Sequence, residues 1–228
     1  MNINTSEKGK CIIICAGKYH EKDASRLKKV LVPGSDLIIA ADAGLEYAIK
    51  ADIVPDIIVG DFDSLPEGGL VSPEEYAEEH GSLVIRLKPV KDETDTLKAL
   101  QIGLEHGYTE FHLFFATGRR LDHTMANVQC LKYLKANKAD GFIHDNGSAI
   151  SVINGPEEVQ FPEGVHGNVS IFASGRTKGV NIKGLRYEAE DLALTDTFPL
   201  GVSNELVGAP ASISVQSGTL LVFFPDLT

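Results

Sequence analysis

Short apolar runs alternate with longer stretches of helical periodicity up to about residue 146. The runs are almost continuously apolar, which indicates strands buried on both faces of a sheet. Apolar residues with helical spacing occupy 95–106 and 122–135, where Met125 and Val128 share a stripe, and each of these predicted helices begins at an aspartate. Strands that alternate with helices predict βαβ units and a mainly parallel sheet. The predicted strands are 11–15, 37–41, 57–59, 82–85, 111–116 and 141–143.

Beyond about residue 147 the helical period disappears, and partly alternating apolar runs are separated by turn signals such as Asn154-Gly155. We therefore expect two domains. Residues 1–146 form an α/β domain with a mainly parallel, Rossmann-like sheet that lacks the G-x-G-x-x-G fingerprint, and residues 147–228 form an all-β, sandwich-like domain. The strands predicted in the second domain are 149–153, 168–172, 212–215 and 220–224.

Composition narrows the class of protein. A hydrophobic content of 43% and a charged content of 23% are ordinary for a globular chain, and the formal charge of -11 argues against a nucleic-acid partner. The polar start, Met1 to Lys10, precedes an apolar run too short for a signal core or a membrane span. Three cysteines, an odd number, favour reduced and buried thiols. We expect a cytoplasmic protein.

Aspartates follow the predicted strands at four places, which is a pattern typical of magnesium and phosphate sites. Asp61 and Asp63 flank Phe62, so an extended backbone is expected to point both carboxylates to one side and Phe62 into the core. A solvated turn is the alternative. Asp42 follows another strand, and its alternative role is a helix N-cap before Ala43.

The other two places precede the predicted helices. Thr94 and Asp95 are either capping residues, with Lys98 as a partner of Asp95, or part of a phosphate site at a helix N-terminus, with Lys98 near the phosphates. Arg120 and Asp122 are either a local ion pair with an N-cap, or a pair in which Arg120 contacts phosphate. Gly118 suits a tight turn close to a ligand.

Four such places in one α/β domain favour a ligand site over coincidence. No phosphate-binding loop of the G-x-x-x-x-G-K-[ST] type and no G-x-G-x-x-G fingerprint is present. Nucleotide binding is therefore expected to depend on carboxylates and a metal.

The motifs and their order resemble those of the thiamine pyrophosphokinase family. They are Gly60-Asp61-Phe62-Asp63-Ser64, Lys91-Asp92-Glu93-Thr94-Asp95 with Lys98, Gly118-Arg119-Arg120-Leu121-Asp122-His123, and Gly201-Val202-Ser203-Asn204-Glu205. The resemblance covers most of the chain. It implies an enzyme that transfers the pyrophosphoryl group of ATP to the hydroxyl of thiamine, giving thiamine diphosphate and AMP, with Mg²⁺ as cofactor.

The resemblance also implies roles for single residues and an assembly. In such enzymes the matching aspartates gather around metal and phosphates, and the implied assembly is a homodimer with thiamine sites at the subunit interface. The expected metal ligands are Asp61, Asp63 and Asp95, which are also the expected catalytic residues together with Lys98; the expected nucleotide contacts are Asp42, Thr94, Arg120 and Asp122, and the expected thiamine contacts are Ser203 and Asn204.

Two other functions are compatible with the residues. One is a pyrophosphokinase or phosphotransferase for another heterocyclic alcohol such as a pterin, which the α/β half supports equally well. The other is a regulatory protein that binds thiamine or a nucleotide without catalysis, although simple sensing needs no set of metal-binding acids.

Overall fold

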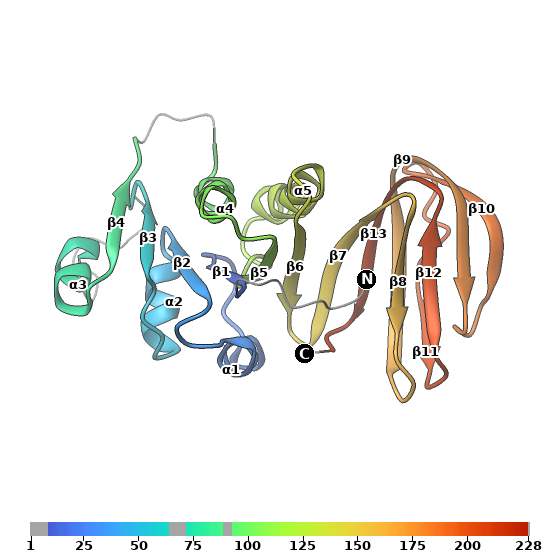
Figure 1. Cartoon of the computed structure of the whole chain (residues 1–228), viewed down its shortest axis with the longest axis horizontal. Helices are drawn as coiled ribbons and strands as arrows, with labels where there is room; N and C mark the ends of the chain where they lie inside the picture. The colour runs from blue at the N-terminus through green and yellow to red at the C-terminus, as the bar shows by residue number, and fades with distance from the viewer. Residues whose placement is uncertain (1–8, 64–71, 89–92, 228) are drawn as a thin grey trace. The chain divides into compact units, whose positions relative to one another are not determined.

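The computed structural model describes residues 9–63, 72–88 and 93–227 (Figure 1). The chain divides into two compact units, and the division falls between Asn146 and Gly147. The first unit has α/β architecture and the second is rich in β-strands. Within the described residues, none of the helices combines the length and the apolar character needed to cross a membrane.

The first unit contains a parallel sheet whose strand order is β4-β3-β2-β1-β5-β6. All six strands were predicted, with ends that differ by no more than a few residues. The strands are β1 (Cys11–Ile14), β2 (Leu37–Ala41), β3 (Ile57–Gly60), β4 (Leu83–Arg86), β5 (Glu110–Phe114) and β6 (Asp140–Asp145). Their parallel pairing confirms the prediction of βαβ units. The predicted burial is confirmed for β1, β2, β3 and β5, but the edge strand β4 is largely exposed or half-buried.

Helices cover both faces of this sheet (Figure 1). Ile12 and Ile14 of β1 pack against α1 and α2, and Ile58 of β3 packs against α2 and α3. On the other face, Gly103 of α4 lies against Cys11 of β1, where a Cβ would come within 2.7 Å of the sulfur. The helices are α1 (Glu21–Val30), α2 (Gly44–Lys50), α3 (Pro73–His80), α4 (Asp95–Glu105) and α5 (Leu121–Ala136).

Two expectations for α5 are wrong. The helix begins at Leu121 with Arg120 in the N-cap position, so it does not start at Asp122. Met125 is 61% exposed and does not share the buried stripe of Val128, Leu131 and Leu134. The apolar character of Met125 suggested burial, but Leu121 and Met125 both lie on the exposed side of the helix.

The second unit is an antiparallel assembly in which one long strand, β9, pairs with four others. The main strand order is β7-β13-β9-β12-β8, and β10 and β11 also pair with β9. The strands are β7 (Ser148–Asn154), β8 (Glu157–Phe161), β9 (His166–Lys183), β10 (Ala189–Thr195), β11 (Asn204–Val207), β12 (Ala211–Val215) and β13 (Ser217–Pro225). The sandwich arrangement of these strands stays a prediction.

Two glycines help β9 to change partners along its length. Gly175 and Gly179 have φ angles of 80° and 65°, a left-handed conformation that glycine adopts without steric cost. Before Gly175 the strand pairs mainly with β11 and β13, and beyond Gly179 it pairs with β10 and β12. The predicted strand 168–172 was therefore only part of a much longer one.

The three cysteines are buried and unbridged, in agreement with the expectation of reduced thiols. Burial raises the pKa of the Cys15 thiol to about 12 and that of the Cys130 thiol to about 11. Both are protonated and unreactive near neutral pH.

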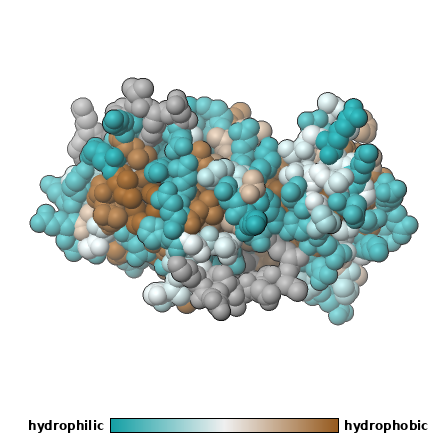
Figure 2. All heavy atoms as spheres, turned by 45° about the horizontal axis from the view of Figure 1, so that its top comes forward, coloured by the Kyte–Doolittle hydropathy of each residue, from teal (hydrophilic) through white to brown (hydrophobic). Residues whose placement is uncertain are grey.

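On the face drawn in Figure 2, hydrophilic residues dominate, although hydrophobic residues gather in one patch on the α/β unit.

Candidate active site

Asp42 directly follows β2 and does not cap a helix. The N-cap of α2 is Ala43, so the capping alternative is wrong. Asp42 has a φ of 51°, which aspartate tolerates better than most residues, and its N–H donates to the Val59 carbonyl oxygen at 2.8 Å. This hydrogen bond ties the end of β2 to β3, and the Asp42 side chain, 8% exposed, lines a cleft at that point.

Asp61 and Asp63 follow β3 and converge on Asp42. Carboxylate oxygens of the three residues all lie within 4.8 Å of one another. The predicted extended backbone is wrong, because Phe62 has a φ of 63° and the chain turns there. Phe62 nevertheless enters the core as predicted, where it packs with Leu45 of α2 and its neighbours. The burial of Phe62 thus anchors a turn that brings both flanking carboxylates to the cleft.

The N-terminus of α4 supplies two further cleft residues. Thr94 is the N-cap, and its Oγ1 accepts a hydrogen bond from the Leu97 N–H at 3.2 Å. Thr94 and Asp95 both line the cleft, so capping and a place in the site are compatible. Lys98 does not line it, and its Nζ donates to Gln101 Oε1 at 3.4 Å. A role for Lys98 therefore stays a prediction.

The connection from β5 to α5 adds positive charge. Gly118 has a φ of 89°, as expected for a tight turn. Arg120 lines the cleft and donates from its Nε and Nη2 to both carboxylate oxygens of Asp122, at 3.2 and 2.6 Å. This hydrogen bonding, with the charge of Arg120, lowers the pKa of Asp122 to about 2. The predicted ion pair is present, and Asp122 itself does not line the cleft.

The sequence analysis searched for aspartates and therefore missed several other residues that line the cleft. Arg119 lines the cleft and donates from Nη1 to the Ala16 carbonyl oxygen at 3.4 Å. Asn127 of α5 is buried and donates from Nδ2 to the Ala116 carbonyl oxygen at 2.7 Å, which holds the end of β5. Ala16 and Gly17 also line the cleft, and their position directly after the predicted strand 11–15 could have identified them from the sequence. Ser64, Lys91 and Asp92, which belong to the recognised motifs, lie outside the described residues.

The cleft has a volume of about 370 Å³, and its negatively and positively charged side chains come from different parts of the α/β unit. Its acids follow β2 and β3 or begin α4, whereas Arg119 and Arg120 follow β5, on the other side of β1 in the sheet. Carboxylate oxygens suit a hard divalent cation, and arginines suit phosphate oxygens. The arrangement can hold a cation and a polyphosphate side by side at the carboxyl ends of the strands, where open α/β sheets bind ligands.

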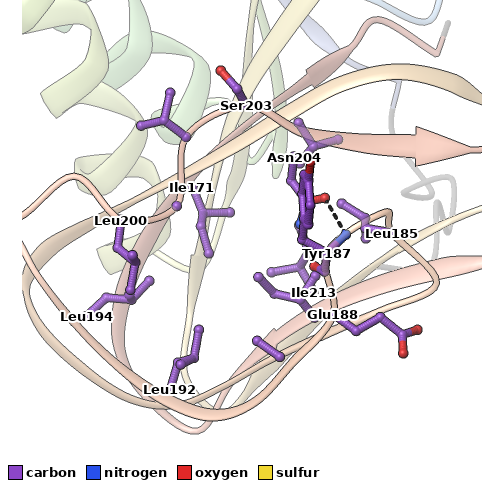
Figure 3. A pocket seen from close by; sticks show the side chains of 15 residues that line it. Ile171, Leu185, Tyr187, Glu188, Leu192, Leu194, Leu200, Ser203, Asn204 and Ile213 are labelled. Atoms are coloured by element: carbon purple, nitrogen blue, oxygen red, sulfur yellow. Dashed lines mark hydrogen bonds between the residues drawn. The ribbon is translucent and has the colours of Figure 1, made fainter.

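Ser203 and Asn204 lie in the second unit and line a different pocket, with a volume of about 210 Å³ (Figure 3). Ser203 has a φ of 61° and its N–H donates to Ser170 Oγ at 3.0 Å, so it makes a turn before β11 while it also lines the pocket. The pocket is mostly apolar: Leu192, Leu194 and Leu200 contribute aliphatic side chains. It therefore suits an organic molecule with exposed apolar surface.

Two family models match separate parts of the chain. The model described as the thiamin pyrophosphokinase catalytic domain matches residues 29–143, and that described as the thiamin pyrophosphokinase vitamin B1 binding domain matches residues 156–220. The first match falls within the α/β unit and the second within the β-rich unit.

Individual relatives agree with the family models. The chain is 27% identical over 187 residues to a thiamine pyrophosphokinase of Bacillus subtilis, covering 82% of this chain and 86% of the relative. The crystal structure of thiamine pyrophosphokinase from Bacillus subtilis is similar with a TM-score of 0.80 at 24% identity, covering 96% of this chain and all of the other. The solved structure of thiamin pyrophosphokinase from Candida albicans has a TM-score of 0.74 at 19% identity, covering 96% of this chain and 90% of the other. At these identities the two solved structures establish the fold alone.

Proposed function

The chain belongs to the thiamin pyrophosphokinase family, and we propose from this premise that the cleft of the α/β unit binds ATP with magnesium. The reaction is transfer of the pyrophosphoryl group of ATP to the hydroxyl of thiamine, which gives thiamine diphosphate and AMP. The observation that carries the proposal for the cleft is the convergence of the Asp42, Asp61 and Asp63 carboxylates within 4.8 Å of one another.

The donor set fits Mg²⁺. Magnesium binds hard oxygen ligands, usually one or two carboxylates together with phosphate oxygens, and three carboxylates that meet beside two arginines supply that environment. We propose that Asp61 and Asp63 hold the ion, with Asp42 and Asp95 supporting them. The bound ion would neutralise charge on the phosphate oxygens.

The remaining cleft residues then act on the nucleotide. Arg119 and Arg120 carry planar guanidinium groups suited to phosphate oxygens, and the positive end of the α4 helix dipole favours an anion near Thr94 and Asp95. Pyrophosphoryl transfer needs the thiamine hydroxyl in line with the bond to the leaving AMP, so catalysis depends mainly on positioning and on neutralised charge. Asp122, held to Arg120, positions that guanidinium.

Thiamine is assigned to the pocket of the β-rich unit, which lies within the matched vitamin B1 binding region. This match disfavours the alternative of a pterin substrate. We further propose a homodimer with thiamine sites at the subunit interface, which light scattering coupled to size-exclusion chromatography tests. Three buried, unbridged cysteines support a reducing, cytoplasmic location.

The decisive assay measures nucleotide products. Purified protein with ATP, magnesium and thiamine should release AMP and not ADP, and chelation of magnesium should stop the release. ADP as the sole nucleotide product would rule out pyrophosphoryl transfer. Asp61→Asn and Asp63→Asn each keep the size of the side chain but remove its charge, so AMP release should fall at least about 100-fold.

Asp52→Asn is the matched control. Asp52 is exposed, does not line the cleft and has a φ of 53°, a conformation that asparagine also tolerates. Its AMP release should stay within about twofold of wild type, because surface substitutions away from special features have small effects. Equal losses in all three variants would contradict the assignment of Asp61 and Asp63.

A further inference from the structure

Arg86 ends the edge strand β4, next to the turn between Asp61 and Asp63. Parallel pairing sets Arg86 opposite Gly60, the last residue of β3, and the Leu87 N–H donates to the Gly60 carbonyl oxygen at 2.8 Å. Among the described residues, Arg86 is not one of those that line the cleft, and its side chain is 55% exposed. It therefore reaches the turn from outside the site.

The guanidinium of Arg86 contacts the turn at two points. Its Nη1 donates a hydrogen bond to the Asp61 carbonyl oxygen at 3.4 Å, and its Cζ lies 5.0 Å from the centroid of the Phe62 ring. A cation over an aromatic face is attracted by the negative potential of the ring. Phe62 is the residue with a φ of 63°, so Arg86 holds both the ring of the strained residue and the carbonyl group that precedes it.

Glu74 of α3 holds the guanidinium in this position. Its Oε1 accepts hydrogen bonds from Arg86 Nε at 3.1 Å and from Arg86 Nη2 at 2.6 Å, and this hydrogen bonding lowers the pKa of Glu74. The start of α3 is itself fixed, because Ser72 and Glu75 form a capping box and Pro73 follows the N-cap. One planar group thus connects α3, β4 and the turn after β3, at one edge of the sheet (Figure 1).

We propose that Arg86 is a positioning residue for the turn that binds the metal. It holds the backbone so that the Asp61 and Asp63 carboxylates stay beside that of Asp42. The inference rests on the proposed function, which assigns a magnesium ion to these carboxylates. Groups that orient metal ligands raise metal affinity, because the ion then does not have to order the ligands itself.

The sign of the effect separates positioning from simple charge. Arg86 is a cation beside a proposed cation site, so its electric field alone weakens metal binding, and its removal would then strengthen binding. Loss of positioning has the opposite effect, because the ion must order a turn that Arg86 no longer holds. The direction in which metal affinity changes therefore identifies how Arg86 acts.

The first test measures binding of Mn²⁺, a paramagnetic substitute for magnesium, by electron paramagnetic resonance on the full chain without nucleotide. The Kd for Mn²⁺ should rise about fivefold in Arg86→Met. It should rise about threefold in Arg86→Lys, which keeps the charge but loses the planar fork that reaches Glu74 and Asp61 together. If either folded variant binds Mn²⁺ as tightly as the wild type, or more tightly, the proposal is overturned.

Arg186→Met is the matched control. The Arg186 side chain is 54% exposed and its Nε lies 2.7 Å from Glu205 Oε2, so it forms a similar ion pair, but in the β-rich unit. Its Kd for Mn²⁺ should stay within about twofold of wild type, because exposed ion pairs contribute little elsewhere in a protein. A loss equal to that of Arg86→Met would mean that the effect is not specific to the turn, and the proposal would fall.

The second test uses turnover. In Arg86→Met the magnesium concentration that gives half-maximal AMP release should rise about fivefold, while the KM for thiamine is unchanged and saturating magnesium restores kcat to within about twofold of wild type. A merely structural role would lower the amount of active protein and leave the magnesium requirement as it is. A wild-type magnesium requirement therefore overturns the proposal.

The two measurements also keep this inference apart from the proposed function. If the wild-type chain binds Mn²⁺ with the Arg86 dependence given above but releases no AMP, the pyrophosphoryl transfer is wrong and the role of Arg86 stands. If Asp61→Asn and the wild type bind Mn²⁺ equally weakly, the assignment of the metal is wrong, and the inference about Arg86 is overturned with it.

Discussion

Single residues in unusual conformations shape the cleft of the α/β unit. Phe62 has a φ of 63° and Asp42 a φ of 51°, in a region that costs most residues free energy and persists only where the surroundings enforce it. For Phe62 the enforcement is burial among Leu45, Ile58 and Tyr76. Burial of Phe62 in the core thus offsets the strain of the turn, and the turn places the Asp61 and Asp63 carboxylates next to that of Asp42.

The Arg120–Asp122 pair yields a prediction about nucleotide affinity. Arg120→Ala removes the phosphate partner, so the KM for ATP should rise about tenfold, whereas Asp122→Asn only loosens the guanidinium and should raise it about threefold. Because the pKa of Asp122 is about 2, the pair stays ionised throughout the neutral range, and the ratio of the two effects should not change between pH 6 and pH 9. Steady-state kinetics at several pH values measure this. A larger effect from Asp122→Asn than from Arg120→Ala would contradict the assigned order of roles.

The positions of these residues were predictable, whereas their backbone angles were not. Sequence spacing placed Asp42, Asp61, Asp95 and Arg120 at strand ends, and strand ends of a parallel sheet converge. The left-handed turn at Phe62 depends on the surrounding core, and a local pattern carries no information about that. Arg119 was missed because the search for metal ligands followed the aspartates.

At the level of elements, strands β5 and β6 share a buried pair of histidines. One ring nitrogen of His112, Nδ1, lies 2.8 Å from His144 Nε2, and the other, Nε2, lies 2.9 Å from Glu110 Oε1. Burial lowers the pKa of His112, although the neighbouring Glu110 carboxylate acts in the opposite direction. His112 is therefore neutral in the folded protein at pH values at which it already takes up a proton in the unfolded chain.

This difference predicts acid destabilisation. Below the unfolded pKa of about 6.5, the unfolded chain binds more protons than the folded one, so the free energy of unfolding should fall as the pH falls, by up to about 1.4 kcal/mol per pH unit. His112→Gln, which cannot titrate, should show a shallower slope between pH 6.5 and pH 5 in urea unfolding, whatever its stability at pH 8. His166→Gln, at an exposed position, is the control and should keep the wild-type slope. An unchanged slope in His112→Gln would exclude His112 as the origin.

Elements of the two units differ in how far the sequence predicts them. The central strands of the parallel sheet, such as β1 and β3, are buried on both faces and appear as continuous apolar runs. The edge strand β4 is more exposed, but its run of Leu83, Val84 and Ile85 is also apolar, and all six strands were found. In the second unit β8, β10 and β11 were missed, because their sequences, such as EEVQF and AEDLALT, are polar on their exposed positions and lack a strong alternation. Pairing with β12 or β9 stabilises these strands, and for β8 and β11 that pairing connects residues distant in sequence.

For the whole molecule, the division between Asn146 and Gly147 separates the cleft that we propose binds the nucleotide from an apolar pocket. The loss of helical periodicity near residue 147 predicted two domains from the sequence. The assignment of one substrate to each unit is a hypothesis. It requires that a substitution that damages one site leaves ligand binding at the other site intact. Ligand-induced thermal stabilisation tests this directly, because any ligand that binds only the folded state raises its stability by mass action.

Tyr187 lines the apolar pocket and is 65% exposed, so Tyr187→Leu changes that pocket and leaves the cleft unaltered. Magnesium with α,β-methylene-ATP, which cannot release AMP, should raise the melting temperature of the wild type and of Tyr187→Leu equally, and should have little effect on Asp61→Asn. Thiamine should show the reverse preference: it should stabilise Asp61→Asn as it does the wild type, and Tyr187→Leu less at the same concentration. At 100 times its Kd a ligand contributes about 2.7 kcal/mol, and a tenfold weaker Kd removes roughly half of this, so the differences are measurable. If each substitution abolished stabilisation by both ligands, the sites would not be separable, and the assignment of one substrate to each unit would be wrong.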